Sequence, residues 1–137
     1  MDKVLSIAIE AAVEAGKIIL GYYSKEKIFR KKIDGSPLTY ADQKSHKKIC
    51  MILEQTDINV VSEEGENHYT DQNNYWLVDP LDGTKDFLAK NNEFTVNIAL
   101  IKEKNLAFGV VYAPALKELF VGVIGDKAWK LKLGDKK

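Results

Sequence analysis

Hydrophobic residues recur at helical spacing in the first part of the chain. Through residues 2–23 the apolar positions follow a 3.6-residue period, which predicts an amphipathic helix that packs on a core. Turn-forming residues at positions 34–38 then predict a loop. A second helix is predicted over residues 40–54, with Thr39 as its N-cap and Asp42 three positions later in a capping box.

From residue 58 onward the pattern changes to short apolar runs separated by turn residues, which is typical of β-strands. The predicted strands cover residues 58–62, 75–78, 95–101, 106–112, 118–123 and 128–133. Two helices followed by mainly antiparallel strands predict an α+β fold with layered helices and sheet. In a chain of 137 residues we expect one domain with its own core.

Carboxylates follow two of the predicted strands at the point where each strand ends. Glu63 and Glu64 come directly after residues 58–62, and Asp79 and Asp82 follow the next strand. If these strands are parallel neighbours, their ends bring Glu63, Asp79 and Asp82 together. Two like charges about 4 Å apart repel by roughly 4 kcal/mol at an effective dielectric constant near 20, so the cluster needs a proton, a basic partner or a cation. Mg²⁺, which prefers oxygen ligands, is the natural partner.

The residues between and after the two aspartates favour metal and phosphate binding. Pro80 restricts the predicted turn and would direct the Leu81 carbonyl oxygen toward the same ion. Gly83 permits a close approach of the backbone to a ligand, and a helix that starts at Thr84 would present backbone amides to a phosphate. Asp-Pro and Asp-Gly are also common turn pairs, so an ordinary exposed loop remains the alternative.

The order of these motifs resembles the inositol monophosphatase superfamily of lithium-sensitive, magnesium-dependent phosphatases. The resemblance is carried in the same order by residues 34–42, 63–64 and 79–84. Inositol monophosphatases usually continue with Thr-Asn after Asp-Gly-Thr, whereas this chain has Lys85-Asp86-Phe87. Lys85-Asp86-Phe87, together with residues 93–101 and 109–114, resembles the 3'(2'),5'-bisphosphate nucleotidases of the CysQ type.

The resemblance implies a fold, a reaction and a set of site residues. The fold would be the layered sandwich of the sugar-phosphatase type. The reaction would be removal of the 3'-phosphate of adenosine 3',5'-bisphosphate, giving AMP and phosphate, by a water that Mg²⁺ activates. The implied metal ligands are Glu63, Asp79, the Leu81 carbonyl and Asp82. The implied substrate-binding residues are Glu63, Leu81, Asp82, Gly83 and Thr84. Catalytic roles would fall to Asp42, Thr84 and Glu63, with Asp42 and Thr84 orienting the attacking water.

Members of the superfamily are considerably longer than this chain, and their second half supplies a Trp-Asp motif whose aspartate completes the second metal site. Here Trp76 is followed by Leu77, and Trp129 is followed by Lys130. We therefore expect residues 1–137 to be the amino-terminal, metal- and phosphate-binding part of the fold, either a truncated product or a fragment. An uncovered sheet would then favour a homodimer or other self-association.

Composition narrows the classes of function. Twenty basic and twenty acidic residues give a formal net charge of zero, which disfavours nucleic acid as a partner. Without a visible signal peptide or membrane-spanning run, and with Cys50 as the single cysteine, a cytoplasmic location is expected, and peripheral membrane association stays open. His46 is expected to be exposed among lysines.

Two alternatives to a nucleotidase remain: an inositol or sugar monophosphatase, and an inactive domain that binds metal or phosphate without turnover.

Overall fold

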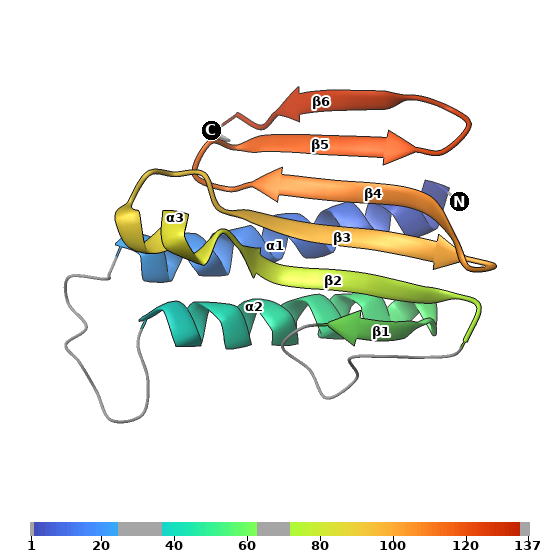
Figure 1. The fold of residues 1–137 in the computed structure, drawn as a ribbon, viewed down its shortest axis with the longest axis horizontal. Coiled ribbons are helices and arrows are strands. Elements are labelled where there is room, and N and C mark those ends of the chain that lie inside the picture. Colours follow the sequence, from blue (N-terminus) through green and yellow to red (C-terminus); the bar gives the residue numbers. More distant parts are fainter. Residues whose placement is uncertain (1, 25–36, 63–71, 135–137) are drawn as a thin grey trace.

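The computed structural model describes residues 2–24, 37–62 and 72–134, in which two long helices lie on one face of a six-stranded sheet (Figure 1). The helices are α1 (Asp2–Ser24), α2 (Pro37–Leu53) and the short α3 (Thr84–Ala89), and a 3-10 turn covers Glu54–Thr56. The strands are β1 (Asn59–Ser62), β2 (Tyr75–Asp82), β3 (Thr95–Lys102), β4 (Asn105–Ala113), β5 (Glu118–Val123) and β6 (Ala128–Lys132). None of these helices is long and apolar enough to cross a membrane. The predicted α+β class is confirmed.

The strands lie in the sheet in chain order, from β1 at one edge to β6 at the other (Figure 1). β1 and β2 are parallel, and every later neighbouring pair is antiparallel. In the parallel pair, Ser62 at the end of β1 is opposite Val78 of β2. The predicted parallel pairing of the first two strands is therefore confirmed.

Alternation of side chains gives the sheet a covered face and an open face. On the covered face the strands pack against α1 and α2 through buried residues that include Trp76, Val78, Ile98, Phe108 and Val110. The helix α1 packs against α2 and against β3 and β4, and small residues form a buried stripe along it. Four alanines in this stripe are fully buried: Ala8, Ala11, Ala12 and Ala15.

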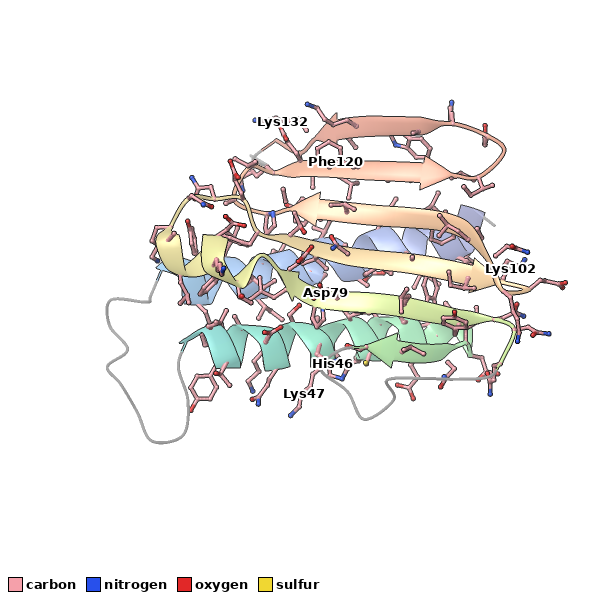
Figure 2. The ribbon with its side chains drawn as sticks, in the orientation of Figure 1. His46, Lys47, Asp79, Lys102, Phe120 and Lys132 are labelled. Atoms are coloured by element: carbon pink, nitrogen blue, oxygen red, sulfur yellow. The ribbon has the colours of Figure 1, made fainter. Side chains whose placement is uncertain are left out.

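The opposite face of the sheet is not covered by any helix in the described part of the chain. Leu77 on β2 and Phe120 on β5 are 48% and 38% exposed (Figure 2 labels Phe120). Gly109 of β4 belongs to the same face, and a Cβ built on it would meet no described atom within 4 Å. The predicted uncovered sheet face is thus present among the described residues.

Two of the boundaries that differ from the sequence prediction lie close to the predicted site residues. α2 begins at Pro37, so Thr39 lies within its first turn, and the predicted N-cap and capping box with Asp42 are wrong. Proline suits the first turn of a helix because its fixed φ is helical and its missing N–H has no partner there. β2 continues to Asp82 instead of ending at Val78, so the aspartate pair lies within a strand and not in a turn that follows it.

Candidate functional site

A β-bulge in β2 places Asp79 and Asp82 on the same face of the sheet. Residues three apart in a regular strand point to opposite faces, because the side-chain period is two. Across the pair with β3, however, Asp79 is opposite Asn97 and Asp82 is opposite Thr95. Three steps along β2 therefore match two steps along β3, and the one extra residue brings both carboxylates to the open face.

Pro80 occupies the bulge and explains its position. Proline has no N–H for the hydrogen-bond ladder, so within sheets it occurs at edges and bulges. The Pro80 ring is fully buried, and its carbonyl oxygen accepts a hydrogen bond of 2.8 Å from the buried Ser45 Oγ on α2. The next amide, that of Leu81, donates to Asp79 Oδ1 at 3.4 Å. The irregular segment is thereby attached both to the helix layer and to the first aspartate.

The second aspartate is held from β3. Asn97 Nδ2 donates to Asp82 Oδ2 at 3.0 Å, and Thr95 Oγ1 donates to Asn97 Oδ1 at 2.9 Å. Thr95 and Asn97 are not among the site residues predicted from the sequence. The sequence feature that could have indicated them is the presence of two polar residues at alternate positions of an otherwise apolar strand. Only the register across the bulge shows which carboxylate they reach.

Asp79 lines a hollow of about 460 Å³ on the open face, and Figure 2 shows it on β2 toward the α3 end of the strand. The hollow is lined by Val61, Ser62, Leu77, Val78, Asp79, Asn97, Ile98, Ala99, Gly109 and Val110. It forms because Ala99 of β3 and Gly109 of β4 are opposite each other and neither fills the surface. A hollow of this size falls within the range of small-molecule sites, which is roughly 300–1,000 Å³.

The helix α3 begins directly after the aspartate strand. Gly83 has a positive φ of 91°, and the Phe87 amide donates to the Gly83 carbonyl at 2.9 Å. A Cβ built on Gly83 would lie 3.0 Å from Asp86 Oδ2 and 3.2 Å from Phe94 Cα, so both the backbone angle and the space require glycine. The predicted helix start at Thr84 is confirmed, and the Thr84 side chain is exposed.

Asp42 lies on α2, one turn before Ser45, and is half-buried. α2 contacts α3, the helix that Thr84 opens. The two predicted water-orienting residues are therefore on neighbouring elements.

Glu63 and Glu64 lie outside the described residues. The residue before them, Ser62, is opposite Val78, which in turn precedes Asp79. Within residues 2–24, 37–62 and 72–134, no three His, Cys, Asp or Glu side chains form a group that could hold a metal ion. Of the three carboxylates predicted to cluster, Asp79 and Asp82 lie among the described residues, and the bulge places these two on one face.

His46 on α2 (Figure 2) is half-buried, and its predicted exposure is wrong. Its Nδ1 lies 3.0 Å from the Oγ of Ser62, and the Sγ of Cys50 lies 3.6 Å from its Nε2. This cluster ties α2 to the end of β1. Burial raises the pKa of the Cys50 thiol above its ordinary value of 9.0, which favours the neutral thiol at neutral pH.

Comparison with known proteins shows which family the chain resembles. The chain matches the inositol monophosphatase family over residues 1–133. It is 44% identical over 135 residues to the 3'(2'),5'-bisphosphate nucleotidase CysQ of Salmonella typhimurium, and this match covers 93% of the chain and 54% of that protein.

Solved structures show the same relationship. The crystal structure of CysQ from Bacteroides thetaiotaomicron has a TM-score of 0.86 and 42% identity, covering 99% of this chain and 52% of that chain. Inositol monophosphatase from Anabaena (Nostoc) sp. PCC 7120 has a TM-score of 0.78 and 30% identity, covering 94% of this chain and 47% of that chain. The chain thus spans about half the length of the relatives that it matches. Because the family match extends over nearly all of its residues, the chain belongs to the inositol monophosphatase family.

Proposed function

We propose that residues 1–137 form the metal- and phosphate-binding part of a 3'(2'),5'-bisphosphate nucleotidase. The enzyme would remove the 3'-phosphate from adenosine 3',5'-bisphosphate and give AMP and phosphate. The observation that carries this proposal is the shared face of Asp79 and Asp82 across the bulge, in a chain of this family. The Salmonella relative that carries the nucleotidase name, at 44% identity, supports the substrate class.

The donor set fits a hard divalent cation such as Mg²⁺. Asp79 and Asp82 offer carboxylate oxygens on one face, and their mutual repulsion is relieved by a cation between them. In this proposal Glu63, Asp79 and the Leu81 carbonyl hold a first ion, and Asp79 and Asp82 share a second. When bound, Mg²⁺ supplies the charge that activates water and stabilises the phosphoryl and leaving oxygens.

The remaining site residues act on water and phosphate. Asp42 and Thr84 orient the attacking water, and the Asp42 carboxylate accepts its proton. The Gly83 and Thr84 backbone, at the start of α3, binds the phosphoryl group. As the bond from water oxygen to phosphorus forms, the bond from phosphorus to the ribose 3'-oxygen breaks, and that oxygen takes up a proton.

An inositol or sugar monophosphatase on the same scaffold is the main alternative. The Anabaena inositol monophosphatase supports it, but its identity of 30% is below the 44% of the Salmonella nucleotidase. Hydrolysis of inositol 1-phosphate and of adenosine 3',5'-bisphosphate should be compared under the same conditions. Faster hydrolysis of the inositol phosphate would reject the nucleotidase assignment.

The direct test is phosphate release from adenosine 3',5'-bisphosphate by the purified chain with and without Mg²⁺. We expect Mg²⁺-dependent release that Asp79→Asn abolishes. Asp126→Asn is the matched control, because Asp126 lies in the turn between β5 and β6. Equal activity of the Asp79→Asn and wild-type chains would contradict the site assignment.

A chain that binds Mg²⁺ without releasing phosphate would instead match the alternative of an inactive binding domain. The two cases are separated by a chimera in which residues 1–133 replace the matching part of the Salmonella enzyme. Activity of the chimera that depends on Asp79 would support the proposed role of these residues. An inactive but folded chimera would reject it.

A further inference from the structure

A chain of two hydrogen bonds connects β3 to the carboxylate of Asp82. The Thr95 hydroxyl donates to the amide oxygen of Asn97 at 2.9 Å, and the Asn97 amide nitrogen donates to Asp82 Oδ2 at 3.0 Å. Thr95 and Asn97 are half-buried, whereas Asp82 is exposed. In the part of the chain that the structure describes, Asn97 is the one side chain that bonds to the Asp82 carboxylate.

The chemistry of the three groups fixes the direction of both bonds. An ionised carboxylate only accepts hydrogen bonds, so the NH₂ end of the Asn97 amide faces Asp82 and its oxygen faces Thr95. The amide oxygen also only accepts, so the Thr95 hydroxyl is the donor. Thr95 therefore keeps the amide from turning over, which would place its oxygen against the carboxylate.

The position of Asn97 relates it to both proposed metal ligands. It is directly opposite Asp79 in the strand register, and it bonds to Asp82 three residues further along β2. It also lines the hollow on the open face together with Asp79. A β-branched apolar residue would suit a strand better than asparagine does, so strand formation does not explain an asparagine here.

We propose that Asn97, held by Thr95, is the residue that positions Asp82 for a divalent cation; this inference rests on the metal site of the proposed function. The amide occupies one lone pair of Oδ2 and leaves Oδ1 for the ion. A carboxylate held in this way has less rotational freedom to lose when it binds metal. Residues that hydrogen-bond to metal ligands typically contribute about 10- to 100-fold to metal affinity.

Four variants separate positioning from folding. Asn97→Val removes the donor and favours the strand conformation. Thr95→Val removes the hydroxyl with little change of shape, and Thr95→Ser restores a hydroxyl. Asn105→Ala is the control, because the Asn105 amide bonds to the Glu103 carbonyl in the hairpin between β3 and β4.

The probe is Mn²⁺, which uses the same oxygen ligands as Mg²⁺, and binding to the purified chain is followed by loss of the EPR signal of the free ion. We expect Asn97→Val to weaken Mn²⁺ binding by about 10-fold or more and Thr95→Val to weaken it less. Thr95→Ser and Asn105→Ala should bind as the wild type does. The melting temperatures of all four variants without metal should stay close to the wild-type value.

The outcomes distinguish this inference from the proposed function. Wild-type Mn²⁺ affinity in Asn97→Val, with binding lost in Asp79→Asn, would overturn the inference and leave the metal site intact. No Mn²⁺ binding by the wild-type chain would overturn both. A loss of affinity in Asn97→Val that accompanies an equivalent loss of metal-free stability would make Asn97 a structural residue and also overturn the inference.

Discussion

Ser45 donates a buried hydrogen bond of 2.8 Å from its Oγ to the carbonyl oxygen of Pro80, 35 residues later in the chain. Ser45 is fully buried on α2, and Pro80 is fully buried in the bulge of β2. The irregular strand segment between the two aspartates is therefore attached to the helix that carries Asp42. One buried hydroxyl links the elements that bear four of the proposed site residues: Asp42, Asp79, Leu81 and Asp82.

Ser45→Ala should lower the free energy of unfolding by about 1–3 kcal/mol, because it leaves a buried carbonyl oxygen without its donor. Urea unfolding followed by circular dichroism measures the change. Ser24→Ala is the control, since the Ser24 hydroxyl bonds to the Gly21 carbonyl at an exposed helix end and should change stability by less than about 0.5 kcal/mol. Similar small changes in both variants would show that the bond to Pro80 contributes little.

Two glycines of α1 should respond to alanine with opposite signs. A Cβ on Gly16 would lie 2.6 Å from Tyr112 Cε2, so Gly16→Ala forces the helix away from the sheet and should destabilise by about 1–3 kcal/mol. A Cβ on Gly21 meets no described atom within 4 Å, so Gly21→Ala should stabilise by up to about 1 kcal/mol through helix propensity. Thermal and urea unfolding of both variants test this, and equal signs would contradict the close approach at Tyr112.

The helices and strands could be predicted because each has a strong local pattern. The apolar stripe of α1 and the short apolar run of β5 between turn residues indicate those elements without any information about their neighbours. The start of α2 was misplaced because Thr39 and Asp42 match a capping pattern, while the fixed φ of Pro37 already suits the helix.

The geometry of the site could be predicted only in part. Asp79 and Asp82 are predicted to lie in a turn because of Pro80 and the Asp-Gly pair. In a regular strand, a spacing of three would instead place them on opposite faces of the sheet. The bulge that resolves this conflict appears only in the register with β3. The partners Thr95 and Asn97 depend on that register as well, and periodicity along one strand cannot supply it.

Gly83 should tolerate alanine less well than Gly125 does, although both have positive φ. In Gly83→Ala the new Cβ would lie 3.0 Å from Asp86 Oδ2 and 3.2 Å from Phe94 Cα, and the backbone would be strained as well. In Gly125→Ala only the backbone strain is present. Strain of this kind costs about 1–3 kcal/mol. Urea unfolding should therefore show a larger loss of stability for Gly83→Ala. A larger loss for Gly125→Ala would contradict the close packing of α3 against the start of β3.

Stability should fall at alkaline pH as Tyr112 ionises. Its side chain is 5% exposed, and burial raises the pKa of its hydroxyl above the ordinary value of 10.0, while Lys117 and Lys17 lower it in part. Because the folded-state pKa is higher than the unfolded one, the unfolded chain loses this proton first. The contribution to stability is complete below about pH 10 and is lost as the pH rises through the folded-state pKa.

Tyr112→Phe isolates this contribution, because it keeps the buried ring and removes the ionisable hydroxyl. The free energy of unfolding of the wild type and the variant should run parallel from pH 7 to about pH 9. Above about pH 10 the wild-type curve should fall more steeply, by at most about 1.4 kcal/mol per pH unit for one proton. Cys50 loses its proton at a lower ordinary pKa of 9.0 and is present in both proteins, so its alkaline contribution cancels in the comparison. Parallel curves up to pH 11 would show that the Tyr112 hydroxyl is no harder to ionise in the folded chain than in the unfolded one.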